Sequence, residues 1–142
     1  MITKIDQFTK SWKMETDNTR KIFNELTDET INKELVRSHR TLGRVAWHIA
    51  QTIPEMLSKT GLTPEGPGEK DPVPQSAEEI KKVYDLAASS ILKQVSENWT
   101  DDSLEIEDDL YGQKWKRGMT LRALMDHEIH HRGQMTVLMR LG

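Results

Sequence analysis

The chain has 142 residues, 35% of them hydrophobic, a formal net charge of −3 and no cysteine. This length suits one domain, residues 1–142, with a hydrophobic core of its own. The missing cysteines exclude disulfides, thiolate ligands and a cysteine nucleophile, and the mixed charges without a basic stripe predict no binding to nucleic acid.

The N-terminal segment carries no targeting signal that we can identify. Met1 to Asp6 lack the apolar core of a signal peptide, and no apolar run of the chain reaches transmembrane length. We therefore expect a cytoplasmic protein that does not associate with membranes.

Two helices are predicted in the first half of the chain. Apolar residues recur at helical spacing from about Ile5 to Leu26 and again from about Thr41 to Lys59. Thr60 to Gln75 holds four prolines and three glycines, so we expect a long surface loop there.

The second half predicts two more helices separated by an irregular segment. Ser76 and Glu79 form a capping box that opens the third helix. Residues 99–118 show no helical period and are expected to form an irregular arm or lid. Thr120 is predicted to cap the fourth helix, which extends to Leu141. Four amphipathic helices predict an all-α four-helix bundle, with a Pro/Gly-rich loop between its second and third helices.

His127 and His131 in the fourth helix are the first candidate site. They lie four residues apart, so both side chains occupy one face, a turn apart, as two ligands of one metal ion would. The alternative is a surface helix whose histidines have no function.

His127, Glu128 and His131 also match H-E-x-x-H, the protease motif in which the glutamate is the general base. The extended form of the motif needs a glycine and a histidine where the chain has Gln134 and Val137. We therefore interpret the match as a coincidence.

A third ligand must come from upstream, where only His39 and His48 are available. His39 lies in a polar loop and is expected to be solvated. His48 shares a polar face of the second helix with Gln51 and Glu55, which resembles a pocket lining. The alternative is a partly exposed histidine at the core boundary.

The fourth helix has a second face that bears on assembly. Arg132 points away from the histidines and is interpreted as a surface residue in a salt bridge. Met125, Ile129 and Thr136 form a thin apolar seam on the back of the helix, which suits pairing in a homodimer; scattered exposed apolar residues are the alternative.

Several of these segments together resemble the DinB/YfiT-like family. They are Arg40-Thr41-Leu42-Gly43, Ala46-Trp47-His48-Ile49-Ala50, Tyr111-Gly112-x-x-Trp115 and His127-x-x-x-His131-Arg132-Gly133-Gln134. The resemblance implies an up-down-down-up four-helix bundle, usually dimeric, in which His48, His127 and His131 bind a divalent metal, most often zinc or nickel. The family is distinct from the translesion polymerase that shares its name.

A three-histidine metal site permits two reaction classes. The resemblance favours transfer of a low-molecular-weight thiol of the bacillithiol type to a small electrophile. Metal-dependent hydrolysis of a small substrate is the alternative enzyme, and a non-catalytic metal-binding stress-response domain is the alternative from another class.

Three polar side chains near the histidines are candidates for catalysis. Glu55 or Glu128 could shuttle a proton, although a structural or solvated carboxylate is the alternative for both. Gln134 projects close to the histidine pair and could hydrogen-bond a ligand or bound water, or could simply fill core.

Overall fold

The computed structural model describes residues 1–37 and 40–141. The prediction for His39 lies outside these residues. The elements in chain order are α1 (Ile5–Phe23), η1 (Thr30–Asn32), α2 (Leu42–Leu57), η2 (Ser58–Thr60), α3 (Ala77–Asn98), η3 (Asp101–Glu105), β1 (Glu107–Leu110), β2 (Gln113–Lys116) and α4 (Arg117–Leu141).

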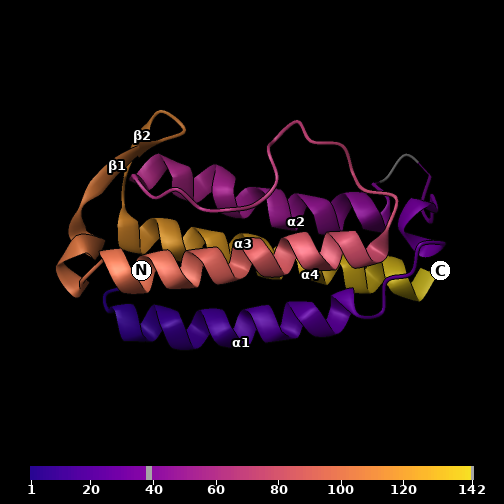
Figure 1. Cartoon of the computed structure of the whole chain (residues 1–142), viewed down its shortest axis with the longest axis horizontal. Helices are drawn as coiled ribbons and strands as arrows, with labels where there is room; N and C mark the ends of the chain where they lie inside the picture. Colours follow the sequence, from indigo (N-terminus) through magenta and orange to yellow (C-terminus); the bar gives the residue numbers. More distant parts are fainter. Residues whose placement is uncertain (38–39, 142) are drawn as a thin grey trace.

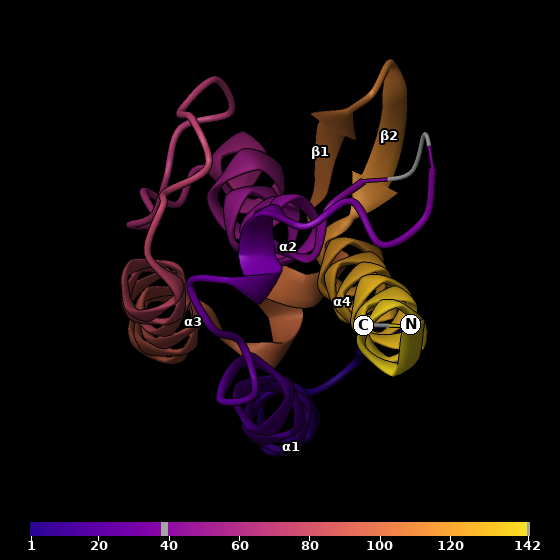
Figure 2. The same cartoon turned by 90° about the vertical axis from the view of Figure 1, so that its right-hand side faces the viewer.

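The four long helices form the predicted bundle, and their directions are up, down, down and up (Figure 1). Seen along the helices, α2 lies beside α3 and α4, and α1 lies beside the same two helices on the opposite side (Figure 2). The core between them is built from large side chains of all four helices, among them Trp12, Tyr84, Ile53 and Leu121. None of the helices in the described ranges is long and apolar enough to cross a membrane.

The Pro/Gly-rich loop has to return along the bundle because α2 and α3 are parallel (Figure 1). Side chains of α2 hold it in place. Trp47 Nε1 donates to the carbonyl of Asp71 at 3.0 Å, and Gln51 Nε2 donates to the carbonyl of Gly68 at 2.9 Å. The loop therefore covers one side of α2.

Part of the segment predicted as irregular is a two-stranded β-hairpin. β1 pairs antiparallel with β2, with Asp108 opposite Trp115. Tyr111 and Gly112 have φ values of 51° and 79°, and two left-handed residues are what a type I′ hairpin turn requires. The strands are mostly charged, so they lack the apolar alternation that would have revealed them.

The fourth helix begins earlier than predicted, at Arg117. Thr120 is therefore not its cap. It is fully buried in the first turns, where its hydroxyl donates to the carbonyl of Lys116 at 3.4 Å. The prediction was wrong because a threonine before an apolar run resembles a cap whether or not the helix has already begun.

Candidate metal centre

Three histidines meet where α2 and α4 pack together. The Nε2 atoms of His48 and His127 are 3.0 Å apart. The ring centroid of His131 lies 4.7 Å from that of His48 and 4.3 Å from that of His127. One ring nitrogen from each residue lies within 4.8 Å of the others, so the structure brings together the three histidines named from the sequence.

The cluster has the dimensions of a metal site. Two tetrahedral zinc–imidazole bonds of about 2.0–2.1 Å place their nitrogens about 3.3 Å apart, and the 3.0 Å between His48 and His127 is close to this distance. Burial, and then the neighbouring charges, lower the pKa values of all three imidazoles, that of His127 to about 4. Near neutral pH the rings are therefore unprotonated, as metal ligands must be.

Gln134 orients one of these rings. The Nδ1 atom of His131 lies 2.7 Å from Oε1 of Gln134. An amide oxygen only accepts hydrogen bonds, so Nδ1 carries the proton and the lone pair of Nε2 remains free for a ligand bond. Gln134 thus contacts the cluster through His131.

Glu55 lies farther from the cluster. It is seven residues beyond His48 on α2, which is about 10 Å along the helix axis. Its carboxylate accepts hydrogen bonds from the hydroxyl of Tyr111 at 2.7 Å and from Nζ of Lys59 at 3.0 Å. Burial and Glu55 raise the pKa of Tyr111, so the phenol keeps its proton and remains a donor.

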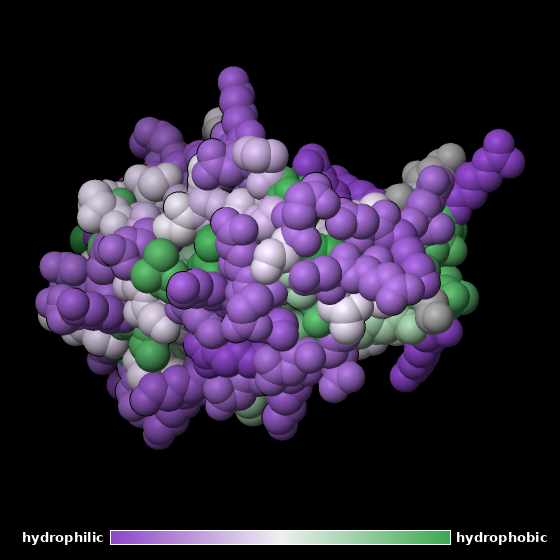
Figure 3. All heavy atoms as spheres, turned by 45° about the vertical axis from the view of Figure 1, so that its right-hand side comes forward, coloured by the Kyte–Doolittle hydropathy of each residue, from purple (hydrophilic) through white to green (hydrophobic). Residues whose placement is uncertain are grey.

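Two cavities of different character meet at the cluster. A polar cleft of about 630 Å³ includes His48, His127 and Glu55 in its lining. A groove of about 590 Å³ includes His131 and Gln134. The groove is otherwise mostly apolar, with Val36, Val45, Val137, Leu138 and Leu141. Hydrophobic side chains gather at this end of the molecule, where α4 ends (Figure 3).

The sequence assigned no site role to several residues that line the polar cleft, among them Arg40, Arg44, Tyr111 and Glu69. Arg44 lies four residues before His48 on α2, so the helical spacing that placed Glu55 on this face could also have placed Arg44.

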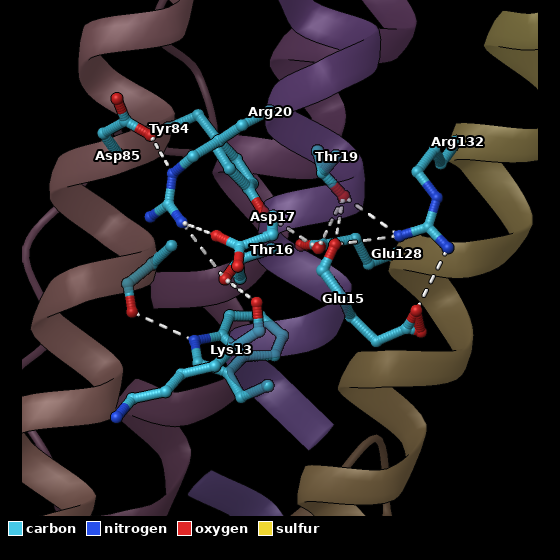
Figure 4. Close-up of polar contacts among 12 residues, drawn as sticks. Lys13, Glu15, Thr16, Asp17, Thr19, Arg20, Tyr84, Asp85, Glu128 and Arg132 are labelled. Atoms are coloured by element: carbon cyan, nitrogen blue, oxygen red, sulfur yellow. Dashed lines mark hydrogen bonds and ion pairs between the residues drawn. The ribbon is translucent and has the colours of Figure 1, made fainter. Parts of the chain in front are cut away.

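Glu128 lies in the bundle interior, beside Thr19 and Tyr84 (Figure 4). Its Oε2 accepts hydrogen bonds from the hydroxyls of Thr19 on α1 and Tyr84 on α3, at 2.8 and 2.9 Å. The side chain is 1% exposed and Oε1 has no partner among the described residues. Glu128 therefore cannot serve as the base of a protease motif or shuttle protons at the cluster, and its structural alternative holds.

Arg132 is half-buried rather than a fully exposed surface residue. Its guanidinium donates to Oε1 of Glu15 at 3.1 Å and to the carbonyl of Glu15 at 2.9 Å (Figure 4). Both side chains are mostly buried between α1 and α4. The sequence correctly indicated a salt bridge, but a single helix cannot show that a second helix covers its charged side.

The chain is similar to known proteins along its whole length. The model of the DinB family matches residues 1–142. The YrdA protein of Bacillus subtilis (strain 168) is 42% identical over 140 residues, which cover 99% of this chain and 84% of that protein. The crystal structure of a DinB-like protein from Bacillus cereus ATCC 10987 superposes with a TM-score of 0.94 at 43% identity, covering 99% of this chain and 93% of that one.

Replacing Gln134 is expected to weaken metal binding. In a Gln134→Met variant, Nδ1 of His131 loses its acceptor, and the affinity for zinc should fall roughly 10- to 100-fold. Competition with a chromophoric chelator measures this. Gln7→Met, an exposed substitution on α1, serves as the control, and equal affinities of the two variants would contradict the orienting role.

Burial of Glu128 predicts a pH-dependent stability. Desolvation, with a smaller contribution from Glu15, raises the pKa of Glu128 to about 7, against hydrogen bonds from Thr19 and Tyr84 and the charge of Arg132. The folded state thus binds the proton more tightly than the unfolded chain. The resulting stabilisation is complete below about pH 4.5 and is lost as the pH rises through 7.

The Glu128→Gln variant should lack this dependence, because its amide does not titrate. Between pH 5 and pH 8 the free energy of unfolding of the wild type should fall relative to that of the variant by roughly 3 kcal/mol. Urea unfolding of both proteins in the presence of a chelator measures the difference. Parallel pH profiles would mean that Glu128 is not protonated in the folded state.

Proposed function

The chain belongs to the DinB family, and we propose that it is a divalent-metal-dependent enzyme of the cytoplasm that transfers a low-molecular-weight thiol, of the bacillithiol type, to a small electrophile. The observation that carries the proposal is the convergence of His48, His127 and His131 at the junction of two cavities. Three protein ligands leave at least one coordination position for a substrate.

Zinc or nickel is the proposed ion. Three neutral imidazoles suit either metal and leave its full charge uncompensated. A divalent ion so held supplies a positive centre that lowers the pKa of a thiol or water molecule bound to it.

The protein's own residues would hold and orient the reactants. Gln134 fixes the His131 ring through Nδ1. Glu55 lies in the polar cleft, where its carboxylate can take up a proton from a ligand, and Tyr111 and Lys59 hold it in place. We assign Glu55 the role of proton acceptor and Gln134 that of a positioning residue.

Hydrolysis of a small substrate is the second candidate. The presence of a carboxylate, Glu55, in the same cleft as two of the histidines favours it, because a general base could activate water there. In a non-catalytic metal-binding domain, protein ligands would instead fill every coordination position of the ion, so no substrate could bind to it.

We also propose a homodimer formed through exposed apolar side chains of α4. The seam predicted from the sequence was wrong for Met125, which is 4% exposed and belongs to the core. Ile129 of that seam is 42% exposed and Thr136 is half-buried, and the dimer would be built around these two residues.

Metal content is the first test of the proposal. Untagged protein purified without chelator or a nickel column should contain about one metal ion per chain, and His48→Ala should lose it because two imidazoles remain. Elemental analysis gives the ratio. Equal metal in both proteins would remove His48 from the ligand set.

The thiol step has a separate spectroscopic test. A small thiol added to the cobalt-substituted protein should produce charge-transfer absorption, because sulfur then joins the three nitrogens. Hydrolysis without thiol chemistry predicts no such band at millimolar thiol, and that result would favour the second candidate.

A further inference from the structure

Two arginines at the entrance to the polar cleft have no ion-pair partner among the described residues. Arg40 precedes the first turn of α2 and Arg44 lies within it, and both side chains are exposed and line the cleft with His48 and His127. Arg40 also lines the apolar groove beside His131, so it lies at the junction of the two cavities.

This placement is unfavourable for the folded protein alone. The N-terminus of a helix carries a partial positive charge and is stabilised by acidic side chains. The first turn of α2 has none; instead it carries Arg44, with Arg40 just ahead of it. Like charges here raise the energy of the helix, which indicates that the two arginines have a role other than stability.

The positive charge reaches the histidine cluster. Arg40 and Arg44 line the same cleft as His48 and His127, and Arg40 also lines the groove beside His131. Of the two glutamates that line the cleft, Glu55 is engaged by Lys59 and Tyr111, which leaves Glu69 to oppose the arginines. A metal on three neutral ligands would add to this positive potential.

We propose that Arg40 and Arg44 form an anion-binding subsite of the polar cleft, and that the substrate bound there is a small organic molecule carrying carboxylate groups. Guanidinium groups bind carboxylates through two parallel hydrogen bonds, which fixes the orientation of the bound molecule as well as its position.

The identity of that molecule as a thiol rests on the proposed function. The carboxylates would bind the arginines while the sulfur reaches the histidine cluster, and the thiol proton passes to Glu55, the proposed proton acceptor of the cleft. The neighbouring apolar groove remains free for the second reactant.

The test compares two thiols that differ in charge. Dissociation constants for mercaptosuccinate, which carries two carboxylates, and for uncharged 2-mercaptoethanol are read from the charge-transfer band of the cobalt-substituted protein. The wild type should prefer mercaptosuccinate by roughly tenfold or more, and Arg40→Gln with Arg44→Gln should abolish the preference. Because the two dissociation constants are compared within each protein, an effect of the lost charges on the metal that both thiols share does not change the preference.

Lys93→Gln is the matched control, since it removes an exposed positive charge from α3, outside both cavities. It should keep the wild-type preference, and 0.5 M salt should weaken that preference in the wild type. A wild type without preference, or a double variant that retains it, would overturn the anion subsite.

A sulfur-free ligand separates this inference from the proposed function. If neither thiol changes the cobalt spectrum, thiol transfer fails, and succinate binding to the zinc-loaded protein is then measured by calorimetry. Succinate binding that the arginine double variant loses would uphold the subsite without the thiol. Absence of succinate binding to the wild type in that case would overturn the subsite as well.

Discussion

The rotation of α4 about its own axis is the constraint on which the histidine cluster depends. This helix carries polar groups on two sides, with His127 and His131 toward α2 and Glu128 and Arg132 toward the interior and α1. A buried carboxylate or guanidinium without partners costs several kcal/mol. Thr19, Tyr84 and Glu15 supply those partners in one orientation only (Figure 4). A turn of one residue, about 100°, would break every one of these contacts and carry the histidines off α2.

The sequence predicted the helices because their burial is periodic, and it predicted the histidine pair because both residues lie on one helix. It could not show what covers the other side of that helix. From the sequence, Glu128 could be a proton shuttle, structural or solvated, and Arg132 was expected on the surface. Only the packing of α1 and α3 shows that other helices cover both side chains. The spacing of residues shows which side chains share a face of one helix, whereas a buried polar contact depends on how two or three helices pack.

The hairpin was missed for a related reason. Strands rich in Glu, Asp, Lys and Gln have no apolar face, so the only local sign of the hairpin is its Tyr111-Gly112 turn. Tyr111 holds a left-handed backbone conformation that a bulky residue rarely adopts. The contacts it gains are at the cleft, with Glu55, with Trp115 at 5.7 Å between ring centroids and with Lys59. Backbone strain of this kind persists where the surrounding contacts require it, and it is found disproportionately at functional sites.

The charges around the cluster differ from those expected at a structural metal site, whose ion stabilises the fold. A structural metal site is closed by four protein ligands, often anionic ones that offset the charge of the ion. Here three half-buried neutral imidazoles face two cavities. The nearby Arg40 and Arg44 add positive charge, whereas a structural metal site would gain from negative charge. The network of Glu128 and Arg132 joins α4 to α1 and α3. Because α2 packs against α4 within the hydrophobic core, neither contact needs a metal. An anion bound in the polar cleft would offset this positive charge, and the proposed carboxylate-bearing ligand is such an anion.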